Sequence, residues 1–323
     1  MIQIETKEFV FTQDTIAPSC HASTVLPLPS GTVLSAFFAG EREGADDVRI
    51  WVVRRANGVW ETPICIPSTI NLPHWNPVLD LRSDGTICLY YKIGKKVRFW
   101  RTYFVLSKDE GKTWTAPQLL VPEDDKSDGR GPVKDKCIRI SNGTLLAPAS
   151  TELKHNWRCF IDISKDDGST WEKQKFIVRL SKNGEIVGMI QPTLWESENG
   201  HIHALMRTNG GNIYRSDSKD YGVTWRKAYA TSLPNNNSGI DCVKDDQGRV
   251  WLLYNPSDKN WGPRSPLTLA ASTDNGITWS DVTNLETEEG WEFSYPAITF
   301  FEGCLHMTYT YNRKTVAYVK ATI

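Results

Sequence analysis

One eight-residue phrase occurs four times in this chain, as "SKDEGKTW" at 107–114, "SKDDGSTW" at 164–171, "SKDYGVTW" at 218–225 and "STDNGITW" at 272–279. The first residues of successive copies are separated by 57, 54 and 54 residues. A period of this length, in a sequence rich in strand-forming residues, is typical of four-stranded propeller blades. The shared Asp can cap backbone amides, Gly can adopt a positive φ, and Thr–Trp can re-enter a strand with the indole packed between units. We therefore interpret the phrase as a structural staple.

A second unit recurs between these phrases and consists of a strand, a short turn that ends in Gly, and another strand. Its six turn glycines are Gly31, Gly85, Gly143, Gly200, Gly248 and Gly303. The stretch "RRANGVW" at 54–60 keeps Gly and Trp and is interpreted as a degenerate first-blade phrase. The segment 3–12 is expected to complete the last blade and close the ring. The sequence thus predicts an all-β fold, a six-bladed β-propeller of four-stranded antiparallel blades, as a single domain over 1–323.

The composition narrows the classes of function. With 37 basic and 38 acidic side chains the net charge is −1, which provides no overall field for nucleic acid or a membrane surface. The beginning of the chain lacks a basic region followed by an apolar run, so we expect a cytoplasmic protein. Seven cysteines without paired spacing are expected to be reduced core thiols. We find no phosphate-binding Gly loop and no convincing metal-ligand set, and expect neither a cofactor nor a metal.

The hairpin geometry predicts where a site would lie. The start of the first strand and the end of the second strand lie at the same end, opposite the Gly turn, and are expected to converge on the mouth of the central channel. First-strand starts are His21, Asn76, Lys134, Gln191, Asn237 and Tyr295. Second-strand ends are Glu41 with Arg42, Lys92, Glu152, Arg207, Asn255 and Asn312. These positions are polar although the strands between them are apolar, which favours a binding pocket over a solvated rim.

Cations outnumber carboxylates at these positions. The cations are Arg42, Lys92, Lys134 and Arg207, and Arg264 from the stretch "NWGPRSPL" adds a fifth. This bias suits a ligand that carries a carboxylate or sulfate, which Arg can hold through two parallel hydrogen bonds.

Two further stretches are candidate substrate-contacting loops, "RGPVKDK" at 130–136 and "LPNNNSGID" at 233–241. In the first, Lys134 and Lys136 alternate on one strand face, where either could bind an anion or Lys136 could lie paired in the channel wall. In the second, the three asparagines either reach sugar hydroxyls or form a turn.

With its phrases at blade spacing, the chain resembles the sialidase (neuraminidase) superfamily of Asp-box, or BNR-repeat, six-bladed propellers along essentially its whole length. The resemblance implies arginines that hold a substrate carboxylate, a tyrosine nucleophile assisted by a glutamate, and an aspartate acid/base. By position, Arg207 closing "HALMR" and Arg264 before "PLTLAASTDNGITW" resemble two of those arginines. Tyr295 in "FSYPAI" resembles the nucleophile, and Asp46 or Asp47 in "EREGADDVRIW" falls where the aspartate stands.

The chain departs from the family pattern at two positions. His21 in "CHAS" replaces a first-blade arginine, and Gln191 in "MIQPTLW" replaces the glutamate. A neutral amide cannot accept the proton of the tyrosine, and histidine holds a carboxylate less reliably than arginine.

Three functions follow from this pattern. The first is an exo-acting glycoside hydrolase that releases a terminal acidic sugar, of the sialic or uronic acid type, from an oligosaccharide. The second is a uronate-dependent lyase acting by β-elimination, such as a rhamnose–glucuronate lyase, with His21, His74 or Tyr295 as base. In that reaction Asn76 or Asn237 would assist the arginines. The third is a sugar-binding propeller without turnover.

Overall fold

The structure is a computed structural model that describes residues 2–124, 129–154, 156–182 and 184–323. Over these residues the chain is all-β, with six main antiparallel sheets, five of four strands and one of five, that correspond to the blades of a six-bladed propeller. Within the described ranges the one helical element is the short η1 (Val97–Phe99). The chain divides into two compact units, Met1–Gly129 with Tyr295–Ile323, and Arg130–Ser294. The single-domain interpretation stays a prediction.

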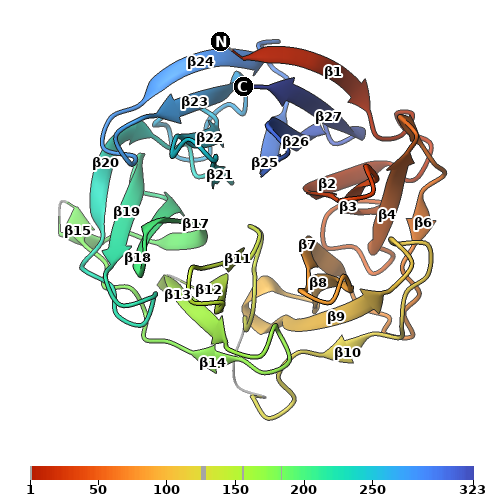
Figure 1. The fold of residues 1–323 in the computed structure, drawn as a ribbon, viewed down its shortest axis with the longest axis horizontal. Helices are drawn as coiled ribbons and strands as arrows, with labels where there is room; N and C mark the ends of the chain where they lie inside the picture. Colours follow the sequence, from red (N-terminus) through yellow and green to blue (C-terminus); the bar gives the residue numbers. More distant parts are fainter. Residues whose placement is uncertain (1, 125–128, 155, 183) are drawn as a thin grey trace. The chain divides into compact units, whose positions relative to one another are not determined.

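Unit 1 contains three sheets (Figure 1). The first is formed by β2 (Ser19–Pro27), β3 (Val33–Gly40), β4 (Arg49–Ala56) and β5 (Val59–Trp60), with β6 (Ile64–Cys65) also paired to β4. The second is formed by β7 (His74–Leu81), β8 (Ile87–Ile93), β9 (Arg101–Ser107) and β10 (Gln118–Leu119). The third contains β25 (Phe293–Phe301), β26 (Cys304–Tyr311), β27 (Thr315–Thr322) and β1 (Gln3–Phe9).

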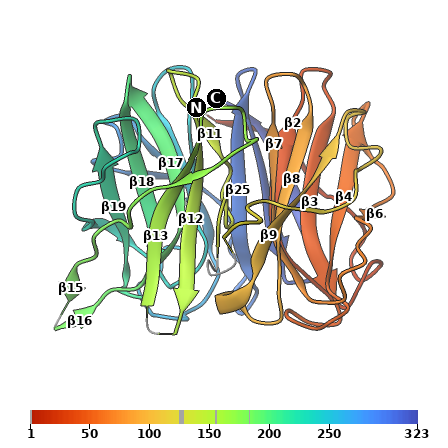
Figure 2. The same cartoon turned by 90° about the horizontal axis from the view of Figure 1, so that it is seen from below.

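Unit 2 contains the other three main sheets. The first is formed by β11 (Ile138–Arg139), β12 (Leu145–Leu153), β13 (Asn156–Ser164) and β14 (Glu172–Lys173). The second is formed by β17 (Met189–Glu198), β18 (His201–Thr208), β19 (Asn212–Ser218) and β20 (Tyr229–Pro234). The third is formed by β21 (Asp241–Lys244), β22 (Val250–Tyr254), β23 (Leu267–Ser272) and β24 (Ser280–Glu286). The separate hairpin of β15 (Ser181–Lys182) and β16 (Glu185–Ile186) projects beyond β19 (Figure 2).

The predicted turns and the predicted closing strand are confirmed. All six turn glycines have a positive φ, between 75° at Gly303 and 85° at Gly31 and Gly143. The N-terminal strand β1 pairs antiparallel with β27, from Gln3 opposite Thr322 to Phe9 opposite Ala317. The first strand of the chain therefore supplies the outer strand of the last sheet.

Each repeated phrase forms a turn with two consecutive left-handed residues. In the first copy these are Glu110 (φ 57°) and Gly111 (φ 81°). The Asp109 carboxylate accepts hydrogen bonds from the Ser107 hydroxyl (2.8 Å) and from the amide (2.9 Å) and hydroxyl (2.6 Å) of Thr113. These bonds hold the pKa of Asp109 at about 2, below its ordinary value, with the Thr113 hydroxyl as the main cause. The interpretation of the phrase as a staple is confirmed.

The core of each unit lies between neighbouring sheets. In unit 1 the side chain of Leu34 on β3 shares one buried cluster with Leu79 on β7 and Leu89 on β8. The turn of the first phrase packs closely against the same cluster, since a Cβ at Gly111 would lie only 2.7 Å from the Leu34 side chain. Adjacent sheets are thus joined by apolar side chains and by the turn itself.

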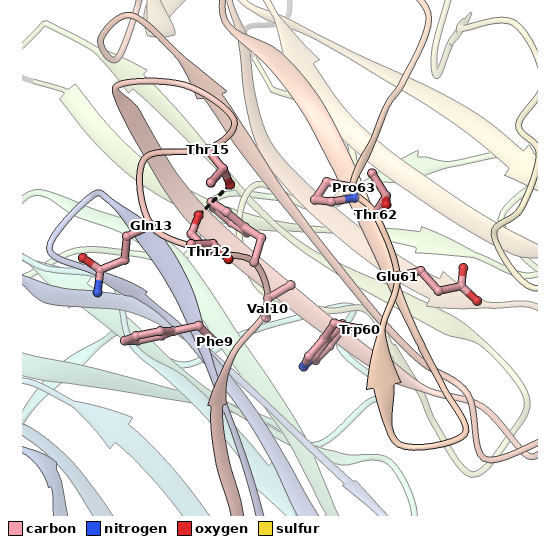
Figure 3. A pocket seen from close by; sticks show the side chains of 10 residues that line it. Phe9, Val10, Thr12, Gln13, Thr15, Trp60, Glu61, Thr62 and Pro63 are labelled. Carbon is pink, nitrogen blue, oxygen red and sulfur yellow. Dashed lines mark hydrogen bonds between the residues drawn. The ribbon is translucent and has the colours of Figure 1, made fainter.

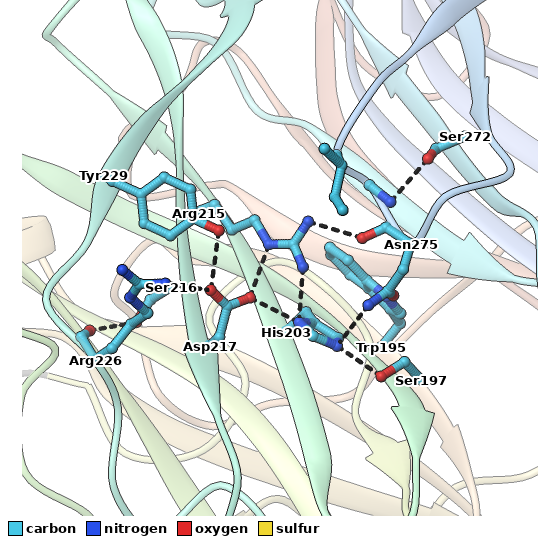
Figure 4. A network of polar contacts seen from close by, with 12 residues as sticks. Trp195, Ser197, His203, Arg215, Ser216, Asp217, Arg226, Tyr229, Ser272 and Asn275 are labelled. Atoms are coloured by element: carbon cyan, nitrogen blue, oxygen red, sulfur yellow. Dashed lines mark hydrogen bonds and ion pairs between the residues drawn. The ribbon is translucent and has the colours of Figure 1, made fainter.

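A polar network provides a second link between sheets in unit 2 (Figure 4). His203 on β18 lies 2.7 Å from an oxygen of Asp217, and its other ring nitrogen lies 3.1 Å from the side-chain amide of Asn275. Arg215 donates to the Asn275 carbonyl (2.7 Å). Burial alone would raise the pKa of Asp217, but hydrogen bonds from His203 and Arg215 hold it below its ordinary value.

The cysteines are free thiols, and five of the seven are buried. Cys65 is exposed and Cys304 is half-buried, so the expectation of core thiols is wrong for these two. Burial raises the pKa of Cys88 to about 12, which keeps it protonated. Among the described residues, no helix is long and apolar enough to cross a membrane.

Candidate functional site

Residues near the starts of β2, β7, β17, β21 and β25 share an unusual backbone conformation, a positive φ. Five non-glycine residues there have a positive φ, namely Ala22 (55°), Asn76 (41°), Gln191 (50°), Asn237 (61°) and Tyr295 (49°). The strand register shifts between His21 and Thr24, between Trp75 and Val78, and between Ile190 and Pro192. A left-handed residue with a Cβ costs about 1–2 kcal/mol, and such bulges redirect side chains. Four of the six first-strand positions predicted from the sequence are themselves left-handed, and a fifth, His21, precedes the left-handed Ala22.

In unit 1, Tyr295 lies against His21. The phenol and imidazole ring centres are 4.2 Å apart and tilted by 49°. The Nδ1 atom of His21 lies 2.9 Å from the Thr310 hydroxyl, which also accepts a hydrogen bond from the Ala22 amide (3.2 Å). Thr310 therefore fixes both the backbone bend and the direction of the imidazole.

A series of ring contacts supports this pair from the neighbouring sheets. The ring of His21 meets Phe38 edge-on at 5.7 Å, and Phe38 meets Trp75 at 6.1 Å. Trp75 is itself fixed by a hydrogen bond from its indole to the Gly94 carbonyl (2.9 Å) and by Trp100 at 5.9 Å. Rigid aromatic neighbours restrict the motion of the Tyr295–His21 pair.

The acidic loop of unit 1 lies at the surface. Asp46 forms an exposed ion pair with Lys95 (2.5 Å), whereas Asp47 accepts the Glu41 amide (2.8 Å) and so caps its own loop. Arg42 is also exposed, and its carbonyl accepts the Ala45 amide (3.0 Å). The ion pair of Asp46 contributes little free energy, because both of its side chains are more than half exposed.

Two predicted site residues of unit 1 are completely buried. His74 pairs with Ile93 in the sheet and stacks on Tyr91, with ring centres 5.4 Å apart. Burial lowers the pKa of His74 to about 4. The Lys92 ammonium donates to the Thr102 hydroxyl (2.6 Å). Both residues have no exposed surface, so the structure places them in the core, and their roles at the site stay predictions.

In unit 2, Arg207 at the end of β18 is the main buried cation of the candidate site. Its Nε donates to the Asn237 side-chain oxygen (2.9 Å) and its Nη1 to the Gln191 side-chain oxygen (3.0 Å). These amide oxygens orient the guanidinium but carry no net charge. Gln191 and Asn237 were predicted to bind substrate, and the structure shows that each contacts Arg207.

An exposed tryptophan lies beside Arg207. The guanidinium carbon lies 5.6 Å from the Trp261 ring centre, and Trp261 meets Trp157 edge-on at 6.5 Å. Trp261 is 62% exposed and has a left-handed backbone (φ 57°). An exposed indole can stack on the apolar face of a sugar ring. No sequence pattern singled out Trp261, although it lies three positions before Arg264.

Arg264 has an acidic neighbour. Its Nη1 lies 2.7 Å from Glu292, which also accepts the Ser294 hydroxyl (2.7 Å). The Arg264 side chain is 16% exposed, and Glu292 holds its direction.

The lysines of the 130–136 stretch form buried ion pairs. Lys134 donates to Asp135 (2.7 Å) and to the Ile240 carbonyl (2.8 Å), and Lys136 lies 2.9 Å from Asp241. Burial raises the pKa of Asp135 well above its ordinary value, although Lys134 opposes that shift. The alternative in which Lys136 is paired is confirmed, and Lys134 is also held internally.

Among the described residues, no group of three or more His, Cys, Asp or Glu side chains is placed to hold a metal ion. A surface pocket of about 640 Å³ lies in unit 1 between the end of β1 and β5, with Phe9, Gln13, Trp60 and Glu61 in its wall (Figure 3). None of the predicted site residues lines this pocket. The convergence of the predicted positions on one channel mouth stays a prediction.

Comparison with known proteins identifies the family. The model of the BNR repeat-like domain matches residues 31–307. The chain therefore belongs to the BNR repeat-like domain family, and the proteins similar to it include sialidases.

The individual relatives are distant. A sialidase of Bacteroides fragilis is 26% identical over 297 residues, which are 86% of this chain and 49% of the relative. The chain thus spans about half the length of that relative. A crystallised Dyadobacter fermentans protein of unknown function superposes with a TM-score of 0.81 at 18% identity, over 100% of this chain and 99% of that one. The Hadza microbial sialidase Hz136 gives 0.79 at 20% identity, over 98% and 68%.

Proposed function

We propose that this protein is an exo-acting carbohydrate enzyme that releases a terminal acidic sugar from an oligosaccharide. The observation that carries the proposal is the environment of Arg207, a 97% buried cation beside an exposed indole. A carboxylate on a sugar ring complements this pair, because the guanidinium binds the acid and the indole binds the ring face. Membership of a family with sialidase relatives supports the same class of reaction.

In the hydrolytic mechanism, Arg207 and Arg264 hold the substrate carboxylate. The Tyr295 oxygen attacks the anomeric carbon while the bond to the leaving oxygen breaks, and a carboxylic acid of the 41–47 loop, Asp46 or Asp47, protonates that oxygen. The phenolic proton passes to His21, the ionisable group in contact with the Tyr295 ring. Water then cleaves the glycosyl–tyrosine bond and regenerates the enzyme.

The contact between His21 and Tyr295 favours a second candidate, elimination. One of the two groups removes the proton from the carbon next to a uronate carboxylate, the arginines stabilise the resulting charge, and the other group protonates the leaving oxygen. The C–O bond breaks as a C=C bond forms, so no water enters either product. Hydrolysis and elimination therefore use the same pair of residues but give products of different mass.

The experiment is incubation of the purified protein with sialylated and uronic-acid-terminated oligosaccharides in water enriched in oxygen-18. Hydrolysis adds one labelled water to the summed mass of the products, whereas elimination adds nothing and leaves an unsaturated sugar that absorbs ultraviolet light. Saturable binding without any product would overturn both enzymatic mechanisms and support the sugar-binding propeller.

The variant that tests the roles is Tyr295→Phe, with Tyr311→Phe as the matched control. Tyr311 lies on β26 of the same sheet and contacts Phe9, with ring centres 4.9 Å apart, outside the proposed site. We expect turnover to fall by about 10³-fold or more in Tyr295→Phe and by less than about twofold in the control. Retained turnover in a folded Tyr295→Phe protein would exclude the phenol from the chemistry.

A further inference from the structure

The three consecutive asparagines of unit 2 lie between the two arginines that we assign to the carboxylate. Asn235, Asn236 and Asn237 are each at most 1% exposed. We call them the asparagine clamp. Their side chains are therefore buried, and sugar contact by these residues stays a prediction.

Asn235 fastens the clamp to β18, the strand that contains Arg207. Its side-chain oxygen accepts the backbone amide of Thr208, the residue immediately after Arg207 (3.0 Å). Its own backbone amide donates to the Gly211 carbonyl (3.0 Å). The position of the clamp along β18 is thereby fixed.

Asn237 contacts Arg207 directly. Its side-chain oxygen accepts from Arg207 Nε (2.9 Å), and its side-chain nitrogen donates to the side-chain oxygen of Asn260 (3.0 Å). The backbone of Asn237 is left-handed (φ 61°), which directs the amide between these two partners. One amide therefore links Arg207 to the loop that leads to Arg264.

Asn236 holds that loop at two points. Its carbonyl accepts the backbone amide of Trp261 (3.0 Å), and its side chain donates to the carbonyl of Pro263 (2.5 Å). Pro263 is the residue immediately before Arg264. The clamp thus bonds next to both arginines, at Thr208 on one side and at Pro263 on the other.

We propose that the asparagine clamp positions Arg207 and Arg264 so that both guanidinium groups face one carboxylate. This inference rests on the proposed function and extends it by naming the residues that set the arginine spacing. Two arginines bind one carboxylate well when their separation is fixed in advance, because each flexible side chain otherwise loses conformational freedom on binding. The clamp residues are positioning residues, since they act through the arginines.

The first test needs no substrate. In protein labelled with nitrogen-15 at arginine, hydrogen exchange at the Nε–H groups of Arg207 and Arg264 reports how firmly each side chain is held. We expect Asn237→Ala to accelerate exchange at Arg207, and Asn236→Ala to accelerate exchange at Arg264. Asn212→Ala is the matched control, because Asn212 also donates a side-chain hydrogen bond to a backbone carbonyl, that of Thr231 (3.2 Å).

The second test uses Asn237→Asp, which tolerates a left-handed backbone and keeps the acceptor for Arg207. The new negative charge would partly neutralise Arg207, and the variant loses the donor to Asn260. We expect KM for an acid-terminated oligosaccharide to rise by about tenfold or more, with kcat reduced much less. Asn236→Ala should raise KM by about tenfold, the effect of one lost hydrogen bond, and Asn212→Ala by less than about twofold.

The two readouts separate the clamp from the proposed function. Unchanged exchange at both arginines in the clamp variants would overturn the clamp, whatever the enzyme does. Accelerated exchange in a protein that neither turns over an acid-terminated oligosaccharide nor binds free glucuronate or N-acetylneuraminate would support the clamp geometry and overturn the proposed function. Equal losses of thermal stability in Asn236→Ala and Asn212→Ala, without a change in KM, would reduce the clamp to a structural element.

Discussion

Asp274 in the fourth repeated phrase provides a direct test of the staple. Its carboxylate accepts the Ser272 hydroxyl (2.7 Å), the Thr278 hydroxyl (2.5 Å) and the backbone amides of Thr278 (2.9 Å) and Ile277 (3.1 Å). These bonds enclose the two left-handed residues Asn275 (φ 61°) and Gly276 (φ 76°). Asp274→Ala removes the acceptor for all four donors at once.

The expected loss of stability follows from the exposure of these donors. Four hydrogen bonds at about 1 kcal/mol each give an upper figure near 4 kcal/mol. The Thr278 and Ile277 groups are exposed and can bond to water in the variant, which lowers the loss to about 3 kcal/mol. At about 2 °C per kcal/mol for a chain of this size, Tm should fall by about 6 °C.

The assay is urea and thermal unfolding followed by circular dichroism, with Asp246→Ala as control. Asp246 is an exposed aspartate in a neighbouring turn of the same unit, and its removal should change stability by less than about 0.5 kcal/mol. A loss for Asp274→Ala no larger than that of the control would refute the staple.

The same variant has a defined pH dependence. Hydrogen bonding, chiefly from the Thr278 hydroxyl, lowers the pKa of Asp274 from 3.8 to about 2. A depressed carboxyl pKa contributes stability that is present above pH 4 and lost as the pH falls through about 2. The difference between wild type and Asp274→Ala should therefore shrink over that interval, and a constant difference would contradict the assignment.

Three further predictions address packing, titration and specificity. Gly222 (φ 84°) and Gly143 (φ 85°) have the same backbone conformation, but a Cβ would lie 3.1 Å from Leu146 at Gly222 and would meet nothing within 4 Å at Gly143. Gly222→Ala should therefore destabilise the fold by about 1 kcal/mol more than Gly143→Ala, as measured by urea unfolding. Burial lowers the pKa of His306 to about 4, so stability should decline as the pH falls from about 6.5 to 4, and His306→Gln should flatten that decline in pH-dependent thermal unfolding. Trp261→Ala should raise KM for an oligosaccharide by about tenfold, while Val223→Ala, which shortens an exposed side chain remote from Arg207, should leave it unchanged.

The fold was predictable because its signals are local. Each phrase carries the Asp and Gly that its turn requires, and Gly111 needs its left-handed φ whatever surrounds it. The role of β1 was also predictable, since a lone strand at one end of the chain and an incomplete hairpin at the other complement each other. The prediction of core thiols failed at Cys65, which lies on the short edge strand β6, where both residues are exposed.

The sequence predicted where the polar residues stand along each strand, but not where each side chain points. Alternation along a strand assigns a side chain to a face, but a bulge redirects it, and the shift after Trp75 removes that regularity in β7. His74 precedes that shift and Lys92 lies on β8, yet both are fully buried although their positions in the chain match those of site residues. The contacts of Asn236 with Trp261 and Pro263 join segments about 25 residues apart. No local pattern encodes such a contact, so the sequence could not distinguish a clamp from a turn.

The pairing of β1 with β27 has a consequence for synthesis on the ribosome. At about 5–20 residues per second, the N-terminal strand waits on the order of 15–60 s before its partner is made. An unpaired strand is a template for aggregation during that delay. The sequence of β1, "QIETKEF", places Glu5, Lys7 and Glu8 along it and leaves most of its side chains exposed even in the folded sheet. These charges thus oppose aggregation of the nascent chain during the time before β27 is available to pair with β1.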